Sequence, residues 1–342
     1  MTLAIGSILQ NRYRIVKLIG QGGFGAVYRG WDLSLEQPVA VKENFGSDAE
    51  SQRQFEREAK LLAGLRHANL PRVGDHFVVP GQGQYLVMDF VEGKSLTTLL
   101  SERGGPLDEA EVLPWMRQVC EALDYLHTRT PPIIHRDVKP DNIIVAPDGR
   151  AMLVDFGISK VYDPGKGTTI GAKAVTPGYS PPEQYGRGRT DARSDVYALG
   201  LILFEMLAGE HPFASALKAD SAMMASHIGQ PAPSLDSKVP GLGPDLVGLV
   251  NRMLAKQPDA RPSAAEVAAT LGRLGGSSTG LMQVIDAGST PLPLHPNRAL
   301  LTADAASDVG QSAVLKPLQE NRGLVIGAGV MLLLGVIGIV VI

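Results

Sequence analysis

The stretch with the densest set of reactive side chains is residues 135–142, HRDVKPDN. Three cationic side chains, two carboxylates and an amide share these positions, with almost nothing apolar between them. Such a stretch is either a solvated surface turn or a set of groups held apart for chemistry. In the second case its carboxylates could orient a hydroxyl proton or hold a metal ion, and its cations could meet a phosphate group. The rest of the chain has to decide between the two.

A second candidate site is rich in glycine, because Gly20, Gly22 and Gly25 have the spacing G-x-G-x-x-G. Dinucleotide-binding folds use the same spacing, and Glu43 lies where such a fold places its ribose-binding acid. A dinucleotide motif must open a helix, however, and residues 26–38 carry β-branched and aromatic side chains, a glycine and a proline. We therefore predict a hairpin whose small side chains let backbone amides approach phosphates.

A lysine follows at the end of the next predicted strand, in the sequence PVAVK. Ala40 is flanked by valines, which indicates a buried strand that carries Lys42 inward. A buried cation needs a carboxylate partner, because an unpaired charge in the interior is costly. Glu58 is the predicted partner, since it shares one face of a helix with Phe55 and Leu62.

The elements that position these groups change character along the chain. Short β-branched or aromatic runs predict strands at residues 12–20, 26–33, 38–44 and 84–91. Apolar residues at helical spacing predict helices at residues 48–65, 107–127, 194–209, 243–255 and 263–274, with short β-like runs between 133 and 157. We predict an α+β fold of two lobes. Residues 13–90 form a small antiparallel-sheet lobe with one helix, and residues 93–274 form a larger helical lobe.

The C-terminal part of the chain differs from both lobes. Residues 275–322 begin with GGSSTG and continue as weakly periodic, proline-punctuated sequence, which predicts a flexible linker. Residues 323–342 carry no charge and match the thickness of a hydrocarbon core, which predicts a transmembrane helix. Lys316 and Arg322 precede it, so we expect a single-pass membrane protein whose preceding chain lies in the cytoplasm. Gly323 and Gly327 are a weak signal for a homodimer.

Composition excludes some classes of protein. The formal net charge of -3 argues against a nucleic-acid binder, because phosphate neutralisation needs a basic face. The single cysteine, Cys120, has no partner for an intramolecular disulfide, which is typical of a reducing compartment. Cys120 lies in an apolar helical pattern, and we interpret it as a core residue without a chemical role.

Five short motifs together resemble one known family. They are GQGGFGAV, VAVK, HRDVKPDN, DFG and PPE, in that order and at family-like separations. The chain resembles a Hanks-type protein kinase of the bacterial, membrane-anchored kind over residues 13–274, and Lys139 marks the serine/threonine branch. The resemblance implies transfer of the γ-phosphoryl group of ATP to serine or threonine hydroxyls of protein substrates.

The resemblance also assigns roles to residues, and these match what phosphoryl transfer requires. Asp137 is expected to orient the substrate hydroxyl, and Lys139 to reach the transferring phosphate. Asn142 and Asp155 are expected to hold magnesium, with manganese as an alternative ion. The remaining expected ATP contacts, in addition to Asp155, are Ile19, Gly20, Gly22, Gly25, Val27, Ala40, Lys42 with Glu58, Met88, Val91 and Ile144.

The segment from Asp155 to Glu183 corresponds to the activation segment of the family. The resemblance implies that Arg136 pairs with a phosphothreonine there, and Thr168 and Thr169 are the candidates for autophosphorylation. Thr176 stands where members of the family bind the catalytic aspartate and lysine.

Four further residues are expected to hold the site in place or pack beside it. Glu183 of PPE is expected to pair with Arg261, and Asp195 to brace the catalytic loop from a buried helix. We interpret His135 as a packed core residue and not as a base.

The alternative function is a nucleotide-binding pseudokinase that acts as a scaffold at the membrane. Such proteins usually lack the lysine, the catalytic aspartate or a metal ligand, whereas this chain keeps Lys42, Asp137, Asn142 and Asp155. The sequence therefore favours an active enzyme.

Overall fold

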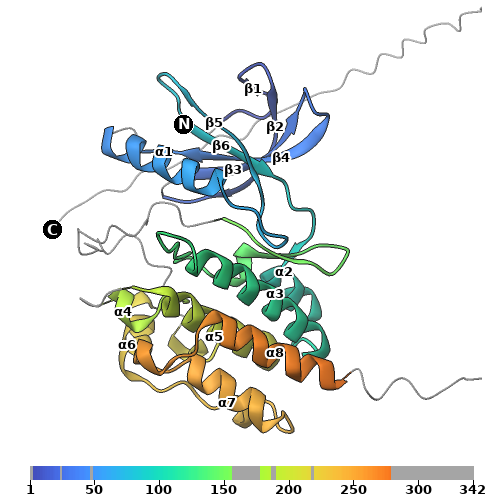
Figure 1. Ribbon diagram of the computed structural model, residues 1–342, viewed down its shortest axis with the longest axis vertical. Coiled ribbons are helices and arrows are strands. Elements are labelled where there is room, and N and C mark those ends of the chain that lie inside the picture. The colour runs from blue at the N-terminus through green and yellow to red at the C-terminus, as the bar shows by residue number, and fades with distance from the viewer. Residues whose placement is uncertain are drawn as a thin grey trace, which may run out of the picture. The chain divides into compact units, whose positions relative to one another are not determined.

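The computed structural model describes residues 3–23, 25–46, 49–155, 178–185, 190–216 and 219–278. The N-terminal part is a six-stranded antiparallel sheet with the strand order β1-β2-β3-β4-β6-β5 (Figure 1). Its strands are β1 (Ile8–Leu9), β2 (Tyr13–Gln21), β3 (Gly25–Asp32), β4 (Gln37–Asn44), β5 (Val73–Val79) and β6 (Gly83–Asp89).

The sheet curls around its own apolar face. The Tyr13 ring on β2 stacks on Phe77 of β5 at 5.8 Å, and the Tyr13 hydroxyl donates a hydrogen bond of 2.8 Å to Asp75. Strands far apart in the sheet order are thereby brought into contact. Tyr28 and Tyr85 are buried between them, so the inner face is a closed core of large side chains. The opposite face of β3 and β4 is left for the site.

Helix α1 (Ala49–Ala63) covers part of the other face of this sheet. Phe55, Ala59 and Leu62 recur at helical spacing, and all three are buried. The helix predicted from this spacing is therefore present. Its apolar stripe joins Leu86 and Met88 of β6 in one core that continues into the C-terminal lobe.

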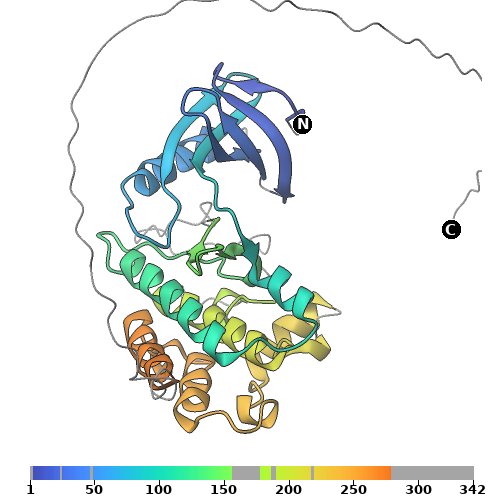
Figure 2. The same ribbon diagram turned by 90° about the vertical axis from the view of Figure 1, so that its right-hand side faces the viewer.

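The C-terminal lobe is mainly helical and lies below the sheet in the view of Figure 2. Its helices are α2 (Leu96–Arg103), α3 (Glu109–His127), the short α4 (Pro182–Tyr185), α5 (Ala192–Ala208), α6 (Asp220–Gly229), α7 (Pro244–Met253) and α8 (Ala264–Ser278). A small antiparallel sheet carries the strands β7 (Lys94–Ser95), β8 (Ile143–Val145) and β9 (Ala151–Leu153). Three-residue 3₁₀ helices occur at Pro140–Asn142, Ala214–Ala216, Leu235–Ser237 and Pro258–Ala260.

Helix α5 is the centre of this lobe. It is buried along most of its length, with a side-chain cap from Asp191 at the N-terminus and Gly209 at the C-terminus. Gly209 has φ 76°, the left-handed conformation that ends many helices and favours glycine. Helices α3 and α7 both pack against α5.

Polar contacts near Asn69 join the two lobes. The Asn69 carbonyl accepts a hydrogen bond from the Leu153 amide of β9 at 2.9 Å. The Asn69 side chain donates to Gln118 on α3, and the Tyr125 hydroxyl accepts from the Arg66 amide. The segment between α1 and β5 is therefore fixed to α3.

The predicted two-lobed α+β architecture is confirmed, with several local differences. The strands β1 and β5 and the helices α2 and α6 lack a clear pattern in the sequence and were not predicted. The expected β-like run PIIH, residues 132–135, forms no strand. Helix α8 ends at Ser278, so residues 275–278 of the predicted linker are helical.

Residues 279–342 lie outside the described part of the chain, which includes most of the predicted linker and the whole predicted transmembrane helix. Within the described ranges, no helix has both the length and the apolar composition needed to cross a membrane.

Two glycines in helices test how tightly α5 is packed. A Cβ at Gly200 would lie 2.8 Å from the Met253 Cβ, whereas a Cβ at Gly248 of α7 would meet no described atom within 4 Å. Gly200→Ala should lower the free energy of unfolding by about 1 kcal/mol, because overpacking outweighs the gain in helix propensity. Gly248→Ala is the matched control and should raise it by up to about 1 kcal/mol. Urea unfolding measures both, and a stabilised Gly200→Ala would contradict the packing.

Candidate active site

The glycine-rich hairpin between β2 and β3 has two kinds of glycine. A Cβ at Gly25 would lie 2.2 Å from the Glu43 carbonyl oxygen, so the fold itself requires glycine there. Among the described residues, a Cβ at Gly20 or Gly22 would meet nothing within 4 Å, and the Gly22 amide donates to the Gly25 carbonyl across the turn. No described side chain or backbone group therefore fills the space beside Gly20 and Gly22, as a group bound from outside would need.

Strand register places the predicted base-contacting residues on one face of the sheet. Val27 lies opposite Lys42, and Ala40 lies opposite Met88. Directly opposed residues of antiparallel strands point to the same side. Of the other residues expected at the nucleotide, Ile19 is exposed near the end of β2, Val91 lies in the connection between the lobes, and Ile144 lies on β8.

Lys42 forms an ion pair with Asp155, which follows β9 in the other lobe. The pair is 113 residues apart in the sequence and joins the predicted phosphate-binding cation to a predicted metal ligand. Asp155 has φ 55°, a left-handed conformation that is unusual for a residue other than glycine. Glu58, the predicted partner of Lys42, lies in α1, but its side chain is outside the described residues. The Lys42–Glu58 pair therefore stays a prediction.

The catalytic-loop residues Asp137, Lys139 and Asn142 converge. The Asn142 Nδ2 donates to the Asp137 carbonyl at 2.8 Å and to the Asp137 Oδ2 at 3.0 Å. The Lys139 Nζ lies 3.3 Å from the same Oδ2. The side-chain amide of Asn142 therefore fixes the direction of the Asp137 carboxylate. The Asn142 Oδ1 is the oxygen that would face a metal ion.

A buried carboxylate on α5 holds the catalytic loop by its backbone. Asp195 accepts the backbone amides of His135 at 2.9 Å and Arg136 at 2.8 Å, and its Oδ2 lies 2.8 Å from the His127 Nε2. Burial opposes ionisation of Asp195, but the hydrogen bonds and charges of its partners, His127 first, outweigh burial and lower its pKa. The predicted brace is confirmed, and His127 on α3 is a further partner that the sequence did not reveal.

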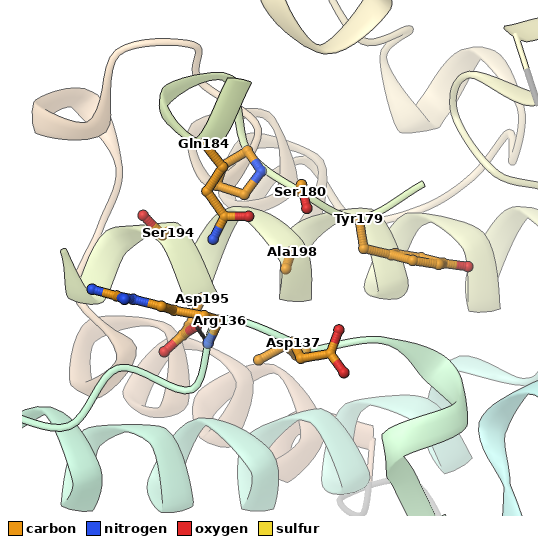
Figure 3. A pocket seen from close by; sticks show the side chains of 10 residues that line it. Arg136, Asp137, Tyr179, Ser180, Gln184, Ser194, Asp195 and Ala198 are labelled. Atoms are coloured by element: carbon orange, nitrogen blue, oxygen red, sulfur yellow. Dashed lines mark hydrogen bonds between the residues drawn. The ribbon is translucent and has the colours of Figure 1, made fainter. Parts of the chain in front are cut away.

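The side chains of the loop divide between two sides of the backbone. Figure 3 shows the Arg136 and Asp137 side chains pointing in opposite directions along the loop that faces Asp195. Arg136 has φ 62° and is 6% exposed, and it lines a small cavity of about 10 Å³ together with Asp137 and Tyr179.

His135 is fully buried, and burial lowers its pKa. A neutral, packed His135 agrees with the prediction that it is a core residue.

The predicted pairing of Glu183 with Arg261 is confirmed. The Arg261 guanidinium donates to both carboxylate oxygens of Glu183, at 2.7 and 2.9 Å, and the Ser194 hydroxyl donates to the Oε1 at 2.7 Å. The Arg261 side chain has no exposed surface. This bidentate pair fixes α4 to the interior of the C-terminal lobe.

Thr168, Thr169 and Thr176 lie outside the described residues, so their roles stay predictions.

The site offers oxygen ligands for a metal ion, one of the groups that phosphoryl transfer needs. In the described ranges no three side chains of His, Cys, Asp and Glu gather as a metal site. Magnesium is often held by one or two carboxylates together with phosphate oxygens of the substrate. Asp155 and Asn142 supply hard oxygen ligands of that kind, so the residues fit a nucleotide-bound magnesium ion.

Comparison with known proteins identifies the family. The family model "Protein kinase domain" matches residues 13–270. The chain belongs to the protein kinase family. Curated relatives of this kinase include pkn2 of Myxococcus xanthus, which is 35% identical over 75% of this chain. PknA of Mycobacterium tuberculosis is 36% identical over 76% of it, and PknJ of the same organism is 33% identical over 84%. All three are named serine/threonine-protein kinases, so the family is that of the bacterial Hanks-type kinases.

A solved structure agrees with this assignment. The crystal structure of the PknI kinase domain from Mycobacterium tuberculosis matches with a TM-score of 0.61 and 28% identity, over 80% of this chain and 99% of that domain. The kinase spans 32% of the length of pkn2, 51% of PknJ and 60% of PknA.

Replacing Asp195 should destabilise the lobe. Asp195→Asn removes an acceptor and turns an N–H group toward the backbone donors of His135 and Arg136. We expect a loss of about 2–4 kcal/mol in the free energy of unfolding, because a buried donor is left unsatisfied. Asp191→Asn on the same helix is the matched control and should cost less than about 0.5 kcal/mol, because asparagine caps helices as well as aspartate does. Equal effects of the two changes in urea unfolding would contradict the brace.

Proposed function

We propose that this kinase is an active serine/threonine protein kinase that uses ATP and magnesium. The observation that carries the proposal is that Asp137, Lys139 and Asn142 contact one another, while Lys42 and Asp155 form an ion pair across the lobes. The similarity to serine/threonine kinases over residues 13–270 supports the same conclusion.

Each residue has a distinct task in the proposed reaction. Bound ATP supplies the phosphoryl group. The Asp137 carboxylate, oriented by Asn142, accepts or orients the proton of the acceptor hydroxyl. Lys139 neutralises charge on the transferring group. Lys42 and Asp155 are adjacent, so a phosphate met by the lysine and a metal ion met by the carboxylate would lie side by side.

The acceptor segment of the protein substrate is proposed to lie beside the catalytic loop. A cavity of about 420 Å³ opens there, lined by Asp141 and Pro140 of the loop and by Tyr179 and Glu205 on the other side. Pro140 and Asp141 belong to the same loop as Asp137, so a substrate segment bound in this cavity would lie beside the loop that carries the catalytic carboxylate.

Removal of the carboxylate discriminates this function from the pseudokinase scaffold. Asp137→Ala should lower transfer of labelled phosphate from ATP to a generic protein at least about 100-fold, because general-base and orienting effects are lost. Asp148→Ala is the matched control, since Asp148 lies in an exposed turn where it pairs with Arg150. Absence of transfer by the wild type, or an unchanged rate in Asp137→Ala, would rule out the enzyme.

Regulation by autophosphorylation is part of the proposal. Arg136 is buried beside Asp137, so a phosphate that paired with it would act directly on the catalytic loop. Thr168 and Thr169 are the proposed acceptors, and phosphopeptide mapping of the wild type and Asp137→Ala proteins from the same reactions identifies them.

We also propose that the kinase is anchored in a membrane by residues 323–342, with the kinase domain in the cytoplasm and residues 279–322 as the linker. The uncharged twenty-residue stretch after Lys316 and Arg322 supports this topology. The pair of Gly323 and Gly327 supports a homodimer through the same helix.

Deletion of the apolar stretch tests the anchor. The protein without residues 323–342 should move from the membrane fraction to the soluble fraction and keep its phosphotransfer rate, because the kinase domain ends before them. Deletion of the equally long residues 283–302 is the matched control and should leave the protein in the membrane fraction. A full-length protein that is soluble without detergent would refute the anchor.

A further inference from the structure

Residues 178–185 run beside the catalytic loop, and we call them the return segment. Its residues Tyr179, Ser180 and Pro181 line the same small cavity as Arg136 and Asp137 (Figure 3). The position of the return segment therefore sets one wall of the space next to the catalytic carboxylate.

One buried histidine holds the start of the return segment. The His211 Nε2 lies 2.8 Å from the Gly178 carbonyl oxygen, 33 residues away in the sequence. The His211 Nδ1 accepts the Phe213 backbone amide at 3.1 Å. Because Nδ1 acts as an acceptor, the proton of the neutral ring must be on Nε2, which donates to Gly178. Both ring nitrogens are thus used, one for a local turn and one for the return segment.

His211 also contacts the next residue of the segment. Its ring meets the Tyr179 ring edge to face, at 5.4 Å and an interplanar angle of 90°. The Tyr179 hydroxyl donates a hydrogen bond of 2.6 Å to Glu205 on α5. Backbone, ring and hydroxyl at positions 178 and 179 are therefore each held by a different contact.

The protonation state of His211 suits a permanent contact. His211 is 4% exposed, and burial lowers its pKa to about 4. The ring stays neutral above that pH, so the donor on Nε2 is present throughout the physiological range. Shape alone does not account for a histidine at this position, because its ring also makes the long-range hydrogen bond to Gly178.

We propose that His211 is a positioning residue for protein phosphorylation. Its Nε2–H group fixes the Gly178 carbonyl and, through it, the register of the return segment against Asp137. The return segment forms one wall of the space next to Asp137, and this wall in turn holds the acceptor segment of the protein substrate. This inference rests on the proposed kinase function and adds a residue outside the ATP and catalytic groups.

Two substitutions separate the two hydrogen bonds of the ring. In His211→Asn the amide oxygen stands near the position of Nδ1 and keeps the Phe213 contact, but no donor reaches Gly178. In His211→Gln the longer side chain places an amide N–H near the position of Nε2 and restores the donor to Gly178. His76 on β5, which packs against Phe55, supplies a control pair with the same two substitutions.

The experiment measures phosphorylation of a serine-containing peptide by the full-length kinase, with ATP affinity measured separately. His211→Asn should lower kcat/KM for the peptide about tenfold and change the Kd for ATP less than about twofold, because one buried hydrogen bond is lost on the acceptor side. His211→Gln should stay within about threefold of the wild type. The His76 variants should change neither quantity.

Hydrogen exchange gives a second measurement that does not need activity. Amides in residues 178–185 should exchange faster in His211→Asn than in His211→Gln. Equal peptide kinetics and equal exchange in the two variants would overturn the inference. So would equal losses of peptide and ATP binding in His211→Asn, which would indicate a general packing role. A wild type without phosphotransfer would instead overturn the proposed function, and this outcome is seen before any variant is made.

Discussion

The catalytic loop depends on one buried carboxylate, that of Asp195. Its oxygens accept two successive backbone amides and face His127, so the loop is tied to α5 and α3 at a single point. Arg136 adopts a left-handed conformation at this point, and the Arg136 and Asp137 side chains are sent to opposite sides (Figure 3). A charge that would be costly in an apolar interior is stable here because three donors surround it.

Helix α5 carries more than this contact. Ser194 bonds the Glu183 carboxylate that Arg261 also holds, and Glu205 near the other end binds the Tyr179 hydroxyl. The helix is therefore the common support of the catalytic loop and of both ends of the return segment. Its apolar side chains are buried on several sides by α3, α7 and α8, which leaves these polar groups little freedom to move.

Much of the site was predictable because its residues stand in short motifs. The loop residues from Asp137 to Asn142 are close in the sequence, so a local 3₁₀ turn is enough to bring them together. Glu183 with Arg261, and Asp195 with the loop, were predicted only through resemblance to a family. The roles of His127 and His211 could not be predicted, since each acts through a partner 33 or more residues away and neither stands in one of the five motifs.

The sequence by itself determined the two lobes, the order of the motifs and the residue types that phosphoryl transfer needs. Apolar periodicity and glycine spacing are local properties, and they decide which segments form strands, helices and turns. Only the tertiary structure decided that Lys42 meets Asp155 and that His211 meets Gly178. These contacts depend on how the elements pack, because loop closure and burial bring together residues that are far apart in the sequence. The number of residues between two groups does not tell how close they lie in space.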